Sequence, residues 1–176
     1  MKTYLEIQVP LKYDASWFQK LRLAYSNIDV RWQMAYHHIT MAFVDETPED
    51  VDLRPLLEKH LNTFPAPTLT FDKLDVFTAM SGMHIINLTA TDVPQSFLSL
   101  IENIRSDLTS AGCVMDSCFR LHVTLGLVKD TNIQLSAIQE LMESVSLPAF
   151  SLTLEDVDYR IFRGKTLYET KLISQK

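Results

Sequence analysis

The sequences YHHITMAFV, at residues 36–44, and RLHVTLGLV, at residues 120–128, repeat one pattern within the chain. In both, apolar or β-branched residues alternate with others, which is typical of a half-buried β-strand whose successive side chains point to opposite faces. Each strand therefore displays a histidine and, two residues later, a threonine on one face. The predicted polar faces contain His38, Thr40 and Ala42 in the first strand and His122, Thr124 and Gly126 in the second. We expect the small residue on each face to leave space for a ligand, and the opposite faces, including Phe43 and Leu127, to enter the core.

The composition bounds the class of protein. The chain has 176 residues, of which 47% are hydrophobic and 22% are charged. These values are typical of a globular protein. The net charge of −6 argues against binding along extended duplex nucleic acid, because that requires clustered Lys and Arg. Small or single-stranded ligands remain open.

The sequence also bears on compartment and redox state. No apolar run approaches the roughly 18 residues of a membrane-spanning helix, and no signal-peptide pattern is present. We therefore predict a cytoplasmic protein with no membrane partner, and we expect a monomer. Cys113 and Cys118 fit neither a disulfide framework nor a four-ligand zinc site, so two reduced thiols are predicted.

Turn and cap signals place the remaining elements. The stretch Thr47-Pro48-Glu49-Asp50 predicts a helix start, with a Thr cap and a proline at the first helical position. Gly112 predicts the end of the clearest amphipathic helix, and Ser81-Gly82 the turn of a hairpin. Strands are expected at 4–9, 69–80, 83–89, 150–162 and 166–173, and helices at 14–26, 48–62, 94–111 and 131–144.

The order of these elements repeats. His122 follows His38 by 84 residues, and a shift of 83 superimposes residues 64–76 on 147–159 with five identities. We therefore predict two copies of a strand–helix–strand–helix–strand unit. The expected fold class is α+β, a bilobal fold with two antiparallel sheets flanking a central cleft and helices outside. The expected single domain spans 1–176, with lobes of about 1–81 and 82–176 related by a pseudo-two-fold axis.

Two histidines and two threonines facing one cleft suit phosphate chemistry. One neutral imidazole can take a proton from an attacking hydroxyl or water while the other, protonated, gives one to the departing oxygen. Threonine hydroxyls can donate to the non-bridging oxygens as negative charge grows on them. Such a site needs neither a metal nor a covalent intermediate.

The motifs HITM, at residues 38–41, and HVTL, at residues 122–125, resemble the paired His-x-Thr/Ser-x motifs of the two-histidine phosphoesterase superfamily. The wider strings at 30–43 and 119–125 are similar to its LigT branch, the RNA 2′,3′-cyclic phosphodiesterases historically called 2′-5′ RNA ligases. The resemblance implies a LigT-like fold and the opening of cyclic phosphates, without a cofactor. It implies that His38 is the proton donor, that His122 is the proton acceptor, and that Thr40 and Thr124 contact the phosphate oxygens.

Two positions depart from the family pattern. Leu127 stands where members often have Arg, and Asp45 where they often have Gly. On a regular strand position 127 faces away from His122, so we expect the phosphate site not to depend on it. Sparse Lys and Arg near the motifs favour a small cyclic-phosphate nucleotide or an RNA 3′ end as the ligand.

Further residues near the motifs have two interpretations. Tyr36 and Arg120 each lie two positions before a histidine, so they are candidates to stack on a base and to pair with a phosphate. A rim position without a role is the alternative. For a third group we expect structural or surface roles: His37, His60, His84, Arg160, Lys165 and Tyr168.

Three other functions compete with the phosphodiesterase. A metal hydrolase would use His37, His38 and His122 as ligands, but His37 and His38 cannot both face one ion from one strand. A binding module would keep the pocket without turnover. A 2′-5′ RNA ligase would run the same acid–base pair in reverse.

Overall fold

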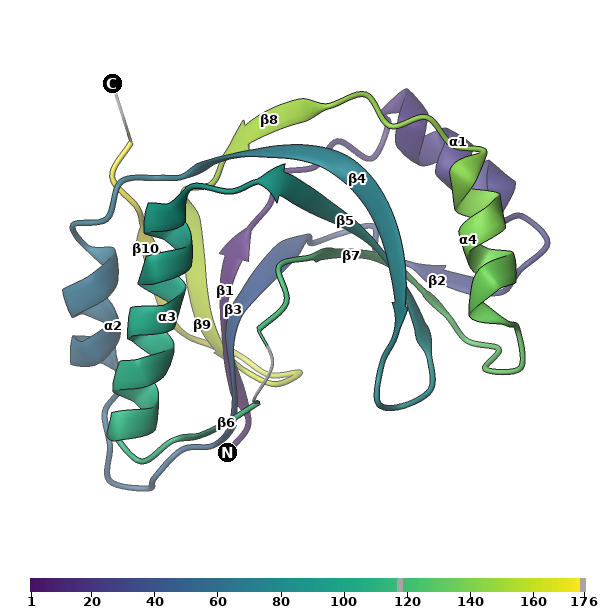
Figure 1. The fold of residues 1–176 in the computed structure, drawn as a ribbon. Helices are drawn as coiled ribbons and strands as arrows, with labels where there is room; N and C mark the ends of the chain where they lie inside the picture. Colours follow the sequence, from purple (N-terminus) through teal and green to yellow (C-terminus); the bar gives the residue numbers. More distant parts are fainter. Residues whose placement is uncertain (117–118, 175–176) are drawn as a thin grey trace.

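The computed structural model describes residues 1–116 and 119–174, which form two curved, antiparallel five-stranded sheets (Figure 1). The first, sheet A, has the order β10 (Thr166–Lys171), β9 (Asp156–Ile161), β1 (Thr3–Gln8), β3 (His38–Glu46), β6 (Val114–Met115). The second, sheet B, has the order β2 (Val30–Trp32), β7 (Val123–Val128), β5 (His84–Asp92), β4 (Thr68–Thr78), β8 (Phe150–Thr153). The predicted α+β architecture is confirmed.

Four helices cover the outer faces of the described sheets (Figure 1). Helices α2 (Arg54–Leu61) and α3 (Gln95–Ser110) pack on sheet A, whereas α1 (Ser16–Ala24) and α4 (Leu135–Glu143) pack against each other at sheet B. Each buries an apolar stripe, because side chains three and four positions apart share one helix face. In α3 this stripe is Phe97, Leu100, Ile101, Ile104 and Leu108.

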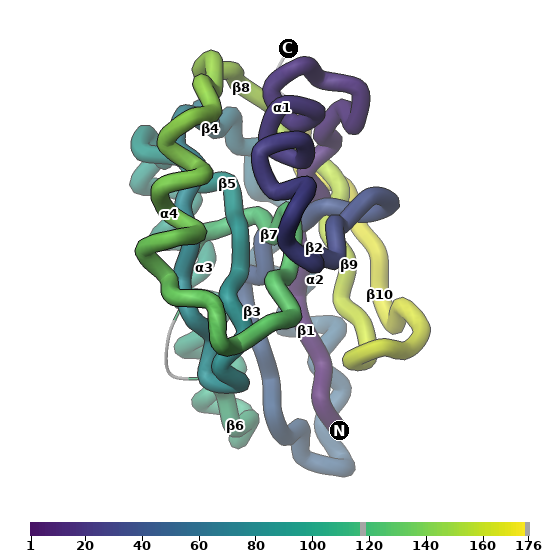
Figure 2. Tube along the Cα trace, turned by 90° about the vertical axis from the view of Figure 1, so that its right-hand side faces the viewer, coloured from purple at the N-terminus to yellow at the C-terminus, as the bar shows by residue number. Residues whose placement is uncertain are grey.

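Both sheets draw strands from both halves of the chain (Figure 2). Strands β1 and β3 of sheet A pair with β9 and β6, while β2 of the first half pairs with β7 in sheet B. The expected boundary between residues 81 and 82 therefore falls in the turn of the β4–β5 hairpin rather than between the sheets. In the pairing of β4 with β8, Leu69 lies opposite Leu152, 83 positions later.

Both histidine strands carry a β-bulge at the same place. Each bulge inserts one extra residue, so two consecutive side chains point to the buried side, at 41–42 in β3 and at 125–126 in β7. Beyond the bulge, the alternation of faces is reversed. The register shifts lie between Leu5 and Glu6 in β1 and between Ile86 and Asn87 in β5, opposite Met41 and Leu125.

The bulges overturn part of the face assignment. Ala42 is 1% exposed and belongs to the core. A Cβ on Gly126 would lie 2.9 Å from the Trp32 ring, so β2 fills the space beside Gly126 that we assigned to a ligand. Phe43, predicted to be in the core, instead lines the cleft. Leu127, the equivalent of Phe43 in the repeat, lies next to the buried Val128 and turns to the same side as Thr124, so the prediction that position 127 faces away from the site was wrong.

Several boundaries also differ from the prediction. Helix α2 begins at Arg54, because the Thr47–Asp50 stretch forms a turn and Pro55 supplies the proline of the first helical turn. Helix α4 begins at Leu135 rather than after Thr131, with Gln134 at its N-cap. The predicted strand 150–162 divides into β8 and β9, which belong to different sheets. The short strands β2 and β6 were not predicted.

Other expectations have simpler outcomes. Gly112, with φ +87°, follows α3 as predicted, and Gly82, with φ +82°, occupies the hairpin turn. Cys113 is buried and free, whereas Cys118 lies outside the described residues. None of the helices in the described ranges combines the length and apolar composition needed to cross a bilayer.

Candidate functional site

His38 is the first residue of β3 and is held against a buried carboxyl. Its Nε2 lies 3.1 Å from Oε1 of Glu6, a residue that is 2% exposed. Its Nδ1 is buried with no hydrogen-bond partner among the described residues. The ring also lies beside that of Tyr36, with 5.1 Å between the centroids. Nε2 of His38 therefore contacts the Glu6 carboxyl, which can also bind a proton.

His122 lies directly before β7 and is oriented differently. Its Nδ1 is 2.9 Å from the backbone carbonyl of Arg120, which can only accept, so Nδ1 carries the hydrogen. In the neutral ring, Nε2 is then the free acceptor. The ring stands edge-on to Phe77, at 5.1 Å between centroids. This tautomer suits a proton acceptor.

One cavity of about 450 Å³ brings residues of both motifs together. Thr40 enters it from the first motif and His122 from the second, together with Arg120. Its apolar walls come mainly from aromatic side chains. These are Phe43, Phe77 and Phe119. A mainly aromatic wall with a few convergent polar groups is the usual composition of a small-molecule site.

Tyr36 and Arg120 occupy equivalent positions with exchanged partners. The Tyr36 hydroxyl donates to Asp158 at 2.8 Å, and Arg160 lies 5.7 Å from its ring centroid. Arg120 lies 4.1 Å from the Phe77 ring centroid and 3.7 Å from Asp75. In the first half, the aromatic residue precedes the histidine and the cation lies on β9. In the second half, the cation precedes the histidine and the aromatic residue lies on β4.

Burial controls the protonation of both histidines. It lowers the pKa of His38 to about 4, and the charges of His122, His37 and Arg160 act in the same direction while Asp158 opposes them. It also lowers the pKa of His122, against the carbonyl of Arg120, which raises it. The charge of His122 thus acts on the protonation of His38, although His122 lines the cavity and His38 does not.

Glu6, Asp158 and Asp75 were not selected from the sequence, and Arg160 was expected to be a surface charge. The sequence repeat could have pointed to Asp75 and Asp158, because they are identical residues at a shift of 83. No sequence pattern pointed to Glu6, since its contact with His38 depends on the pairing of β1 with β3.

His37 lies away from the cavity. It is 3% exposed, packs against Tyr13 and Phe18, and has both ring nitrogens buried without a hydrogen-bond partner in the described ranges. Within those ranges, no group of three or more His, Cys, Asp and Glu side chains is arranged to hold a metal ion. His84 has the structural role expected, bonded to Thr78 and to the Ile133 carbonyl.

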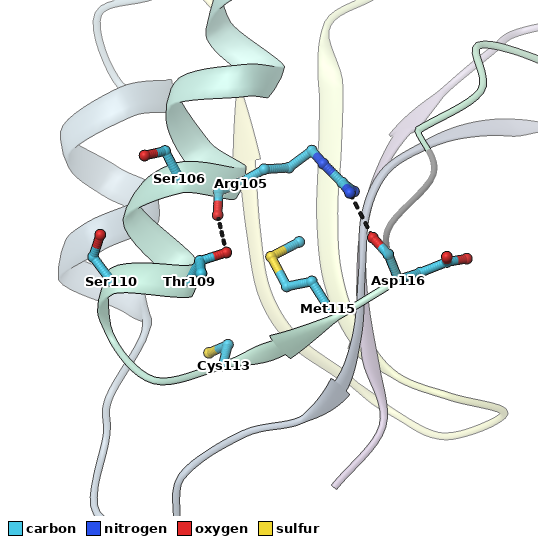
Figure 3. Close-up of a pocket in the computed structure, with 7 residues that line it drawn as sticks. All are labelled: Arg105, Ser106, Thr109, Ser110, Cys113, Met115 and Asp116. Carbon is cyan, nitrogen blue, oxygen red and sulfur yellow. Dashed lines mark hydrogen bonds between the residues drawn. The ribbon is translucent and has the colours of Figure 1, made fainter.

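A second hollow runs along the C-terminal half of α3 (Figure 3). Arg105 lines both this hollow and the aromatic cavity, and its Nη2 donates to the backbone carbonyl of Asp116 at 2.6 Å. Thr109 donates to the carbonyl of Arg105 at 2.9 Å. None of the predicted site residues lines this hollow.

The arrangement of sheets and helices is shared with solved structures. E. coli LigT in complex with NADP+ is 20% identical, with a TM-score of 0.61 over 98% of this chain and 97% of that one. Thermus thermophilus TT0787 is 16% identical, with a TM-score of 0.66 over the whole of both chains. Kluyveromyces marxianus Usb1 is 10% identical, with a TM-score of 0.61 over 98% and 97%. No curated protein matches the chain in sequence.

The fold is therefore LigT-like, as predicted. The family model of the 2′-5′ RNA ligase superfamily matches residues 10–165. The chain belongs to this superfamily.

Proposed function

We propose that the protein is a metal-independent phosphodiesterase that opens 2′,3′-cyclic phosphates on RNA ends or small nucleotides. The observation that carries the proposal is the meeting of residues from both His-x-Thr motifs at one cavity, Thr40 from the first and His122 from the second. Membership of the superfamily supports it. So do the structures of E. coli LigT with 3′-AMP and with ATP, which are small nucleotides.

In this proposal the two histidines act on opposite sides of the phosphorus. His122 Nε2 takes a proton from water as the water oxygen bonds to phosphorus. His38 gives a proton to the departing ribose oxygen as its bond to phosphorus breaks. Thr40 and Thr124 donate to the non-bridging oxygens, where negative charge grows. The product is a 2′- or 3′-phosphomonoester.

The cavity walls suit the nucleoside part of such a substrate. Phe77 and Phe119 offer apolar ring surface for a base, and the Arg120 guanidinium offers charge to the phosphate. Tyr36 lies beside His38, and neither residue lines the cavity itself. We expect an extended duplex to bind poorly, because the chain as a whole is acidic.

The decisive assay is hydrolysis of 2′,3′-cyclic nucleotides in the presence of EDTA. We expect turnover, and we expect His38→Ala and His122→Ala each to lower kcat by on the order of 10³-fold, as for the loss of a general acid or base. His60→Gln, in the α2–α3 contact with Asp107, is the matched histidine control and should keep full activity.

Two other results would refute the proposal. Turnover that EDTA abolishes would support the metal hydrolase, and binding without turnover would support the binding module. A 2′-5′ ligase is the second candidate, favoured by the superfamily to which the chain belongs. Joining of a cyclic-phosphate-ended RNA to a 5′-hydroxyl RNA, faster than hydrolysis, would establish it.

A further inference from the structure

The duplicated framework places different side chains beside the two catalytic strands. Thr40 pairs in register with Glu6, and Thr124 pairs with Asn87. Both partners are buried, at 2% and 1% exposure. Glu6 is ionisable and contacts His38 at 3.1 Å, whereas Asn87 is an amide. In the first half, the residue paired with the threonine is therefore Glu6, which can bind a proton and contacts His38. In the second half, the residue paired with the threonine is Asn87, whose amide does not ionise.

The contacts of the Tyr36 hydroxyl indicate which protonation state of Glu6 forms the most hydrogen bonds. It lies 2.8 Å from Oδ2 of Asp158 and 3.3 Å from Oε2 of Glu6, but it has one hydrogen to donate. Asp158 also accepts from Nε2 of Gln8 at 2.8 Å, so Asp158 is the acceptor of this group. A proton on Glu6 can then be donated to the Tyr36 oxygen or shared with His38. The network is complete when Glu6 carries a proton.

We propose that Glu6 and His38 hold one proton between them, and that Glu6 is the positioning residue for the proton donor of the reaction proposed above. The inference rests on that proposed function. As His122 takes the proton from water, the shared proton passes from Nε2 of His38 to the departing oxygen. This leaves a Glu6 carboxylate and a neutral imidazole. Exchange with solvent returns a proton to the pair and removes one from His122.

The burial of Glu6 and of His38 supports the sharing of one proton between them. It raises the pKa of Glu6 to about 7 and lowers that of His38 to about 4. A lone His38 would therefore be neutral at pH 7, whereas the pair keeps one proton up to about that pH. Arg160 lowers both pKa values and Asp158 raises both. The groups that act on the pair are Tyr36, whose hydroxyl contacts Glu6; Asp158 and Arg160 on β9; His122; and the charge of His37 from its separate buried site.

The test is Glu6→Gln, with Glu140→Gln on the outer helix α4 as the matched control. Two measurements are made on each protein: the pH profile of kcat/KM with a 2′,3′-cyclic nucleotide, and an NMR titration of the His38 ring. In the wild type we expect the His38 signals to change in a step near pH 7. In Glu6→Gln we expect that step to vanish and kcat/KM at pH 7.5 to fall at least tenfold, with recovery toward pH 5.

An unchanged alkaline limb together with an unchanged His38 titration in Glu6→Gln would overturn the inference. If Glu6→Gln does not fold, Glu6→Asp is the second variant for this test. It keeps a buried carboxyl but withdraws it from Nε2 of His38, so we expect the same loss of the step near pH 7. The titration does not require turnover, so it tests Glu6 even if the wild type is inactive on every cyclic nucleotide, which would refute the proposed function instead.

Discussion

The surroundings of His38 and His122 differ although their backbones are built alike. Both strands have the same bulge, and both threonines pair with a buried polar residue of the neighbouring strand. Around His38 that residue is Glu6, a carboxyl in contact with the imidazole. On the other side it is Asn87, while a backbone carbonyl holds Nδ1 of His122. The duplication thus supplies the geometry, and single side chains supply the difference between the two halves.

This difference matters because acid–base catalysis needs two unlike groups. Two identical imidazoles in identical surroundings would share one pKa, and neither would be committed to giving or taking the proton. In the inference above, the carboxyl of Glu6 keeps a shared proton at His38, and the carbonyl at Nδ1 of His122 leaves Nε2 of that histidine free to accept. The proposed roles of His38 and His122 follow from this asymmetry.

Asn87→Asp is the substitution we expect to have the largest effect on this comparison. Nδ2 of Asn87 donates to the backbone carbonyls of Asp75 at 3.0 Å and Ile85 at 3.2 Å. A carboxylate would instead face two acceptors in a buried site. We expect the free energy of unfolding in urea at pH 8 to fall by about 3–5 kcal/mol, as for other unpaired buried charges.

Glu6→Gln is the matched variant in the other half, and its stability should change in the opposite direction. The folded state raises the pKa of Glu6 from 4.5 to about 7, so native stability is lost as the pH rises through this window. Removing the carboxyl removes that loss, and the variant should be at least as stable as the wild type at pH 8. Equal stability changes in Asn87→Asp and Glu6→Gln would mean that the two positions are not distinguished by charge.

The residue before each motif histidine is a second point of contrast, since residue 37 is His and residue 121 is Leu. Burial lowers the pKa of His37 from 6.5 to about 4, so the unfolded chain binds its proton more tightly. Stability is then complete above pH 6.5 and falls as the pH drops toward 4, by at most about 3 kcal/mol.

His37→Phe should therefore flatten the loss of stability between pH 6.5 and pH 4.5. Phe suits a site formed by Tyr13 and Phe18, and any packing change will appear equally at pH 8. The measurement is urea unfolding at these pH values for the variant and the wild type. If the two pH slopes are the same, His37 is not held neutral in the folded protein.

Periodicity in the sequence was sufficient for the regular parts of this fold. The alternation around His38 and His122 predicted two strands, and the stripe from Phe97 to Leu108 predicted α3. Periodicity could not predict the bulges, because an extra residue at Met41 or Leu125 is defined by the register with the neighbouring strand. The same holds for Glu6, whose role depends on which strand lies beside β3. Strands as short as β2 and β6 show no period to detect.

The smallest effects we predict come from the exchanged cation–aromatic pairs. Arg120 lines the cavity next to His122, so Arg120→Met should raise KM for a cyclic nucleotide about tenfold, equivalent to about 1.4 kcal/mol. The charge of Arg120 also lowers the pKa of His122, so the acid limb of kcat/KM should move to higher pH while the alkaline limb changes little. Arg160 acts on the other half, through a charge that lowers the pKa of both Glu6 and His38. Arg160→Met should therefore move the alkaline limb of kcat/KM to higher pH and change KM less. Arg22→Met, on the outer helix α1, is the control for loss of a remote charge. If the two cleft variants behave alike, the exchange of cation and aromatic residue between the halves has no functional consequence, and the difference between the halves reduces to Glu6 and Asn87.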